Sequence, residues 1–302
     1  MSIYVDIVVC APMDAVWAHT QTPALHEQWD LRFSAIDYLP RSDDSAPQRF
    51  RYATRIGFGL EVAGEGETLG HRDLPDGSAT SALKFACDAP LSIIRDGSGY
   101  WKYVPTREGV RFLTWYDYRT RFGVAGTVVD RLIFRPLIGW ATAWSFDRLR
   151  LWLEDRVDPR LAVRLTLIHL VARLSLAAVF AYQGIVPKLL ARHADEIALI
   201  EAAGVPTAQT ATALVALGVA EVALAAALLV AWSRSWPVWL CLIAMPIATL
   251  DVALFSPAFF EAAFNPFSLN LSVAALAAVD LLIIGSVPFA RRCLRCPPLE
   301  KP

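Results

Sequence analysis

The sequence predicts two domains of different class: an α+β domain, in which an antiparallel sheet surrounds a long C-terminal helix, and an all-α bundle of four transmembrane helices. Of the 302 residues, 55% are hydrophobic and the mean hydropathy is +0.41, which is too apolar for an ordinary soluble protein. Residues 1–158 nevertheless mix charges, turn residues and aromatics, whereas long apolar runs begin near Leu165. We therefore expect a cytoplasmic domain over residues 1–158 and a membrane domain over residues 159–302.

The first domain contains, in order, a strand, two short helices, six more strands and one long helix. Residues 3–9 (IYVDIVV) alternate as a strand does, Pro12 lies near the start of a helix, and Thr22 caps a second helix that begins at Pro23. Turn signals separate the remaining six strands, which we expect at about 31–39, 48–56, 58–69, 78–87, 92–104 and 109–121. The closing helix is expected at about 125–155. This is the element order of the helix-grip fold.

The stretch VVCAPMDAVWAHTQTPALHEQWD, which ends near Trp29, resembles the opening of the START-like, polyketide cyclase-like (SRPBCC) superfamily. The resemblance covers about residues 1–155. It implies a curved antiparallel sheet wrapped around a long helix, with a cavity for an apolar ligand between them. It implies no catalytic set, so the function has to be sought in the pocket.

Aromatic side chains on the predicted strands are the candidates for lining that cavity. Trp115 and Tyr116 fall on opposite faces of the last strand, and either face is compatible with the pattern. Ordinary core packing and specific ligand contact both remain open as interpretations. The candidates for ligand contact are Tyr52, Phe58, Phe85, Trp101, Tyr103, Trp115 and Tyr116.

Four apolar segments are long enough to cross a hydrocarbon core, which takes about 20 residues. Helices are expected because lipid cannot satisfy open backbone groups. Three arginines precede the first segment and four basic residues follow the last, whereas the opposite side has Lys188 and Arg192. This asymmetry and the lack of a basic leader predict a multi-pass protein of a bacterial inner membrane with both termini in the cytoplasm. The spans are expected at about 166–187, 211–231, 236–255 and 268–289.

Each span carries polar or ionisable side chains, which are costly in a membrane and usually face the bundle interior. The candidate cluster is His169, Arg173, Tyr182, Gln183, Glu221, Asp251 and Asp280. We expect an inner layer of His169, Arg173, Glu221 and Asp280. We expect an outer layer of Tyr182, Gln183, Asp251 and Lys188, with Lys188 snorkelling to the interface. Structural ion pairs and a polar pocket for a head group, a quinone ring or a proton path both remain open.

The stretches FAYQGIVPKLL, ALGVAEVALAAALLVAW and FNPFSLNLSVAALAAVDLLIIG resemble the DoxX-like family of four-helix membrane proteins, over roughly residues 165–290. The Gly-x-x-Pro-Lys ending of the first span and Glu221 carry most of the resemblance. It implies a connection to quinones or to a membrane redox partner, and it carries over no catalytic residue.

Other chemistry-bearing patterns are weak. Cys293 and Cys296 form a Cys-x-x-Cys pair in a basic tail that would favour thiolate, so either an incidental pair or a redox or metal role is open. The histidines show no metal spacing, so we predict no metal site, and no phosphate loop, dinucleotide fingerprint or nucleophile elbow is present. A net charge of -1 gives no sign of nucleic-acid binding.

The function that we expect is binding and handling of an apolar small molecule, a lipid or a quinone, at the cytoplasmic face of the bilayer. One alternative is an accessory subunit of a quinone-linked membrane oxidoreductase. The other is a structural or interaction protein whose cavity is filled by its own side chains. The sequence leaves open whether the protein is an enzyme.

Overall fold

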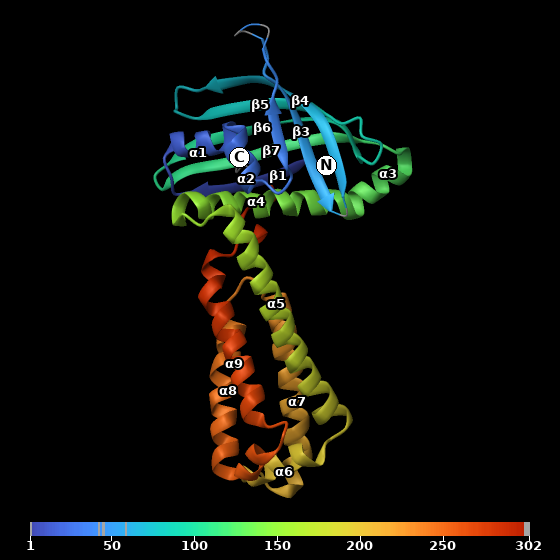
Figure 1. The fold of residues 1–302 in the computed structure, drawn as a ribbon, viewed down its shortest axis with the longest axis vertical. Coiled ribbons are helices and arrows are strands. Elements are labelled where there is room, and N and C mark those ends of the chain that lie inside the picture. The colour runs from blue at the N-terminus through green and yellow to red at the C-terminus, as the bar shows by residue number, and fades with distance from the viewer. Residues whose placement is uncertain (1, 42, 44–45, 58, 299–302) are drawn as a thin grey trace. The chain divides into compact units, whose positions relative to one another are not determined.

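The computed structural model of the chain describes residues 2–41, 43, 46–57 and 59–298 (Figure 1). Its contacts divide the chain into two compact units, Met1–Ala162 with Pro288–Pro302, and Val163–Val287. We expected the residues after the last helix to belong to the membrane domain, but they belong to the first unit. The reason is that the backbone N–H of Phe289 donates to Asp147 and the backbone of Leu294 bonds to that of Asp6.

In the described residues, seven strands form one antiparallel sheet in the order β1-β7-β6-β5-β4-β3-β2. Strands β2 to β7 follow one another as a meander, and β1 pairs with β7 at the opposite edge from β2. The bounds are β1 (Ile3–Val9), β2 (Ala35–Tyr38), β3 (Arg49–Gly57), β4 (Leu60–Asp73), β5 (Ala79–Ala86), β6 (Ile94–Thr106) and β7 (Gly109–Thr120).

Helices of the first unit lie before β2 and after β7. They are α1 (Met13–Gln21), α2 (Pro23–Trp29), α3 (Gly123–Val129), the π-helical turn η1 (Asp130–Phe134) and α4 (Arg135–Asp155). The buried side of α4 packs on the sheet, because the rings of Phe146 and Phe112 stack with centroids 4.4 Å apart. The sheet therefore wraps a long helix, as Figure 1 shows, and the predicted helix-grip fold is confirmed.

The register of β6 and β7 determines which side chains face α4. Trp101 pairs with Thr114, and Gly99 pairs with Tyr116, whose hydroxyl bonds to Thr142 of α4 at 2.9 Å. A Cβ at Gly99 would lie 2.4 Å from the Cβ of Tyr116, so glycine gives the tyrosine the room it needs. Gly99, Trp101, Thr114 and Tyr116 thus share the inner face of the sheet.

The C-terminal tail packs against the edge of the first unit. The short 3-10 turn η5 (Ala290–Arg292) follows Phe289, and the Arg292 guanidinium lies 3.3 Å from the Asp147 carboxylate. Leu294 and Asp6 exchange two backbone hydrogen bonds of 3.0 and 2.9 Å. The tail therefore covers part of the β1 edge, which would otherwise present unpaired backbone groups.

The second unit is helical. Its elements are α5 (Pro159–Gln183, which begins in the first unit), the π-helical turn η2 (Gly184–Leu190), α6 (Ala194–Ala202), α7 (Thr207–Val230), α8 (Trp236–Phe255), η3 (Pro257–Glu261), α9 (Pro266–Ile283) and η4 (Ile284–Ser286). Among the described residues, four helices are long and apolar enough to cross a membrane: Pro159–Leu190, Thr207–Val230, Trp236–Phe255 and Pro266–Ser286. The predicted four-helix region is confirmed, and α6 is an additional helix that we did not predict.

The core of the second unit combines large and small apolar residues. Leu176 and Leu228 are fully buried, and they pack with Ala177, Ala225 and Ala277. Small residues at such contacts let helices approach closely, which is how helices pack in lipid. This core supports the polar clusters described below.

Candidate functional site

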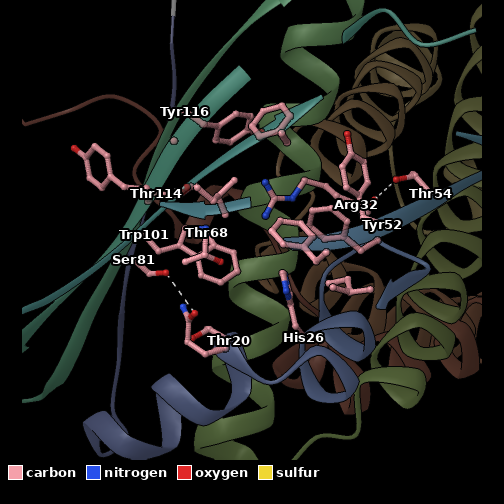
Figure 2. A pocket seen from close by; sticks show the side chains of 18 of the residues that line it. Thr20, His26, Arg32, Tyr52, Thr54, Thr68, Ser81, Trp101, Thr114 and Tyr116 are labelled. Carbon is pink, nitrogen blue, oxygen red and sulfur yellow. Dashed lines mark hydrogen bonds between the residues drawn. The ribbon is translucent and has the colours of Figure 1, made fainter. Parts of the chain in front are cut away.

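A cavity of about 160 Å³ lies between the inner face of the sheet and the helices of the first unit. Figure 2 shows its lining, to which α1, α2, the α2–β2 loop and strands β2 to β7 contribute. The lining is largely aromatic and aliphatic, with hydroxyl groups interspersed. Its aromatic members include Phe33, Phe50, Tyr52, Phe85, Trp101 and Tyr116.

Four of the predicted lining residues lie at this cavity: Tyr52, Phe85, Trp101 and Tyr116. Tyr103 does not line it, because its ring is buried in the core and its hydroxyl bonds to Thr20 and Gln21, each at 2.8 Å. Trp115 does not line it either. Its ring lies on the outer face of the sheet and stacks with that of Tyr100, with centroids 6.0 Å apart. Phe58 lies outside the described residues.

One wall of the cavity is charged. Asp30 is buried at the end of α2, and Arg32 binds it through Nε to Oδ1 at 2.9 Å and through Nη2 to Oδ2 at 2.6 Å. His26, one helical turn before Asp30, donates from Nε2 to Oδ2 at 3.0 Å. His26 and Arg32 line the cavity, and the carboxylate lies behind them.

Packing fixes the position of both cavity-facing groups. The His26 ring stacks on Trp29 with centroids 5.0 Å apart and meets the Trp101 ring edge-on at 4.9 Å. The Arg32 guanidinium lies 5.5 Å from the ring centre of Phe33 and 5.6 Å from that of Tyr116. Aromatic neighbours at these distances stabilise a cation over the ring face.

The protonation state of Asp30 is determined by its two neighbours, Arg32 and His26. Burial alone would raise the pKa of Asp30, but Arg32 and His26 outweigh it and hold the pKa well below its usual range. Asp30 is therefore an ionised acceptor at neutral pH. Arg32 Nη1 and His26 Nδ1 take part in none of the bonds to Asp30, and both side chains line the cavity, where Arg32 also interacts with Tyr116.

Sequence reasoning missed this wall. The signal that was present is the spacing in HEQWDLR, where His26 and Asp30 are four residues apart on one helix face. The contact of Arg32 with Asp30 depends on the turn that follows α2, which the spacing of residues does not specify.

In the second unit, the structure brings three of the predicted intramembrane residues together. His169 Nδ1 lies 2.5 Å from Asp280 Oδ1, and Arg173 Nε donates to Asp280 Oδ2 at 2.8 Å. All three side chains are buried. The remaining nitrogens reach backbone carbonyls at the end of α7 and in the following turn: Leu228, Trp232 and Arg234. The cluster thus supplies hydrogen-bond partners to the C-terminal end of a helix, whose carbonyls have none within the helix.

Glu221 does not belong to that cluster, contrary to our expectation. Its carboxylate lies 3.1 Å from Lys188 Nζ, and Lys188 also lies 3.2 Å from Glu196 of α6. Lys188 is therefore buried between two carboxylates and does not snorkel to the interface. Close backbone contact explains the pairing: a Cβ at Gly184 would lie 2.6 Å from the Gly218 carbonyl oxygen, so glycine brings η2 against α7.

The other predicted members of the outer layer are not brought into this group. The Tyr182 side chain is exposed, and the backbone carbonyl of Gln183, not its amide, accepts from Lys188 at 3.4 Å. The side chain of Asp251, on α8, makes no hydrogen bond or ion pair with another described residue. Depth along the helix therefore predicted the contacts of His169, Arg173 and Asp280, but not those of Glu221 or of the outer-layer residues.

The tail cysteines do not form a thiolate site. Cys293 is buried and its thiol donates to the Ala143 carbonyl at 3.2 Å, and burial raises its pKa. Cys296 is exposed. Within the part of the chain that the structure describes, no group of three or more His, Cys, Asp or Glu side chains is placed to hold a metal ion.

Comparison with known proteins identifies the membrane half. The DoxX-like family matches residues 177–278. The "Uncharacterized membrane protein YndG" of Bacillus subtilis (strain 168) is 49% identical over 183 residues, which make up 60% of this chain and 68% of that protein. The chain belongs to the DoxX-like family. The DoxX-like match includes Gly184, Pro187, Lys188 and Glu221, the residues on which the resemblance was predicted.

Several solved structures are similar to the first half of this DoxX-like protein. The di-domain ARO/CYC StfQ from the steffimycin biosynthetic pathway is 17% identical, with 51% of each chain covered and a TM-score of 0.41. The STAR-related lipid transfer protein from Xanthomonas axonopodis is 17% identical over 50% of this chain and 85% of that chain, with a TM-score of 0.39. The Zhui aromatase/cyclase from Streptomyces sp. R1128 is 14% identical over 51% and 96%, with a TM-score of 0.38.

Proposed function

We propose that this DoxX-like membrane protein binds a small, largely apolar molecule in the cavity of its first unit, with a polar end of the molecule against Arg32 and His26. The observation that carries the proposal is the combination of aromatic walls with one charged wall, because ligand sites are mostly apolar with a few fixed polar groups. The Asp30 carboxylate holds both nitrogen-bearing side chains in place, so the site is ordered before a ligand arrives.

The size of the cavity limits the ligand. Its volume is about 160 Å³. An apolar cavity of about 150 Å³ is known to hold benzene. One ring, such as the ring of a quinone, or the end of a lipid chain therefore fits, and a carbonyl or hydroxyl on it would accept a hydrogen bond from Arg32. Quinone is accordingly the cofactor that we propose to test first.

The alternative of a purely structural protein is less well supported. It calls for an interior filled by the chain's own side chains, whereas residues from six strands and three helices surround open volume here. The intramembrane His169–Arg173–Asp280 cluster, in contrast, bonds to protein groups at each side chain, which supports a structural role for that cluster.

We further propose that the membrane is the bacterial inner membrane and that both termini lie on its cytoplasmic side. Arg160 and Arg164 begin the first span, and Arg291 and Arg292 follow the last helix. On the opposite side, Lys188 is buried in ion pairs, which leaves Arg192 as the exposed arginine or lysine among the described residues. The excess of arginines supports this orientation. If the retained molecule is a quinone, we expect a redox partner of this protein in the same membrane.

The test is native mass spectrometry of the full chain released from lipid nanodiscs, with the retained small molecules identified. We expect a stoichiometric apolar molecule in the wild-type protein. Leu83→Trp fills the cavity from β5 and should abolish retention, whereas Trp115→Leu, on the outer face of the sheet, should not. A wild-type protein that retains nothing, or equal retention by Leu83→Trp, would contradict the proposal.

A further inference from the structure

The helical run from α3 to the first part of α4 carries an outer face that is almost entirely apolar. Val124, Val128, Leu132, Ile133, Leu137 and Trp140 are exposed there, with Val124 at 83% and Leu132 at 70%. We call these six residues the outer apolar face. A helix on the surface of a globular protein normally directs charged and polar residues outward. In residues 123–140, all of which the structure describes, Arg131 is the exposed charged residue.

The orientation of this face is fixed by a polar network on the opposite side of the same helices. Asp130 is buried and accepts from the Tyr118 hydroxyl at 2.6 Å and from Arg135 at 2.8 Å. Arg135 also binds Asp117 at 2.9 Å and lies 4.3 Å from the ring centre of Tyr118. Rotating the helix to bury its apolar side would break these bonds and leave buried charges without partners, which is strongly unfavourable. The apolar side chains therefore stay outward.

The continuity of the chain with the membrane indicates what covers this face. Helix α4 ends at Asp155 and the first candidate span begins at Pro159, so residues 156–158 are the whole connection. A domain tethered this closely to a bilayer meets lipid at a high effective concentration. Trp140 and Arg131 have the chemistry of interfacial residues, because indole rings favour the head-group level and arginine can extend its charge into water.

We propose that the outer apolar face inserts into the surface of the lipid bilayer that the same chain crosses. The partner is the lipid surface itself, with the apolar side chains at the boundary between head groups and acyl chains and Arg131 near the phosphates. This is an interfacial contact, since each exposed side chain adds apolar area and the segment has its hydrogen bonds satisfied as a helix.

The face lies on the same helix as one wall of the ligand cavity. Ile138 lines the cavity, and its neighbour Leu137 belongs to the outer apolar face. One helix thus presents one side to the lipid and the other to the cavity. This gives an apolar ligand a short path from the bilayer, a consequence that rests on the proposed function, whereas the lipid contact does not.

The test uses the full chain in nanodiscs, with the two exposed cysteines, Cys10 and Cys296, replaced by serine. A spin label is attached to a single cysteine introduced at Leu132 or Leu137, or at Arg107 in the exposed β6–β7 turn as the matched control. Collision rates are measured with oxygen, which concentrates in lipid, and with a water-soluble nickel complex. We expect high oxygen and low nickel collision rates at Leu132 and Leu137, and the reverse at Arg107.

Two results would overturn the proposal. Nickel collision rates at Leu132 and Leu137 that equal the rate at Arg107 would place the face in water. Low rates with both reagents would place it against protein, either a second copy of the chain or another partner. A second variant makes the outcome specific: Leu132→Glu with Ile133→Glu should raise the nickel collision rate at Leu137 several-fold. Small-molecule retention in the mass spectrometer is read separately, so failure of the lipid contact and failure of ligand binding are distinguishable.

Discussion

Arg32 and Asp30 meet through two hydrogen bonds, Nε to Oδ1 at 2.9 Å and Nη2 to Oδ2 at 2.6 Å, with the carboxylate buried. Paired bonds of this kind are directional and hold the guanidinium plane in one orientation. The cation that faces the cavity is thus positioned by a group that does not. The ligand site and the stability of the first unit therefore depend on the same contact.

Asp30→Asn should destabilise the first unit strongly. The substitution leaves Arg32 without its charged partner while Arg32 stays nearly buried, and breaking a buried pair in this way costs about 3–5 kcal/mol. The measurement is hydrogen exchange of the β6 and β7 amides in the full chain. Glu65→Gln is the matched control, because its ion pairs with Arg49 and Arg51 are largely exposed, so water screens them and they contribute little to stability. Equal effects of the two substitutions would contradict the role given to Asp30.

The same carboxylate makes the first unit sensitive to acid. Its pKa in the folded state lies below the ordinary value of about 3.9, so the unfolded chain takes up the proton at a higher pH than the folded chain does. The stabilisation is therefore complete above the ordinary pKa and is lost as the pH falls through it towards the folded value. We expect protection of the sheet amides to fall between about pH 5 and pH 3, with a smaller fall in Asp30→Asn. A fall of the same size in the variant would assign the acid sensitivity to other carboxylates.

Periodicity predicted the architecture well and the inner face of the sheet less well. Alternation shows that Trp115 and Tyr116 face opposite sides of β7, but it does not show which side packs on a helix. That choice is made by contacts far apart in sequence, such as the hydrogen bond from Tyr116 to Thr142. The order of elements was sufficient for the helix-grip fold because each strand and helix is bounded by local turn signals.

The intramembrane partners were harder to predict for a related reason. Depth along a helix placed Glu221 beside Arg173, but rotation about the helix axis and the approach of neighbouring helices decide which groups meet. Gly184 and Gly218 bring their helices into backbone contact, and this contact turns Glu221 towards Lys188. His169, Arg173 and Asp280 were grouped by the same depth estimate, and they do meet because their side chains are buried in the same interior.

The two tail cysteines should differ in reactivity. Burial raises the pKa of Cys293 and its thiol is bonded to Ala143, whereas Cys296 is exposed. We expect N-ethylmaleimide at neutral pH to modify Cys296 at least about tenfold faster than Cys293, since only the thiolate reacts. Peptide mass spectrometry of the folded full chain gives both rates.

Asp147→Ala should release the tail and remove that difference. Asp147 accepts from the Phe289 backbone and pairs with Arg292, so its loss removes two of the contacts that hold the tail against α4. Asp155→Asn, on the same helix but at its exposed end, is the control and should leave Cys293 protected. If Cys293 stays protected in Asp147→Ala, the apolar packing of the tail is sufficient to hold it.

Lys188→Met should loosen α6 in the membrane unit. The substitution removes the cation that Glu196 and Glu221 share and leaves two carboxylates near each other, which costs about 3–5 kcal/mol where the groups are buried. The measurement is hydrogen exchange of the α6 amides, Ala194–Ala202, in nanodiscs, where we expect faster exchange with little change in α9. Adding Glu221→Leu to Lys188→Met should restore part of the protection, because one unpaired charge is then removed together with its partner. A double variant that exchanges as fast as the single one would show that Lys188 orders α6 through Glu196 and that Glu221 contributes little to the contact.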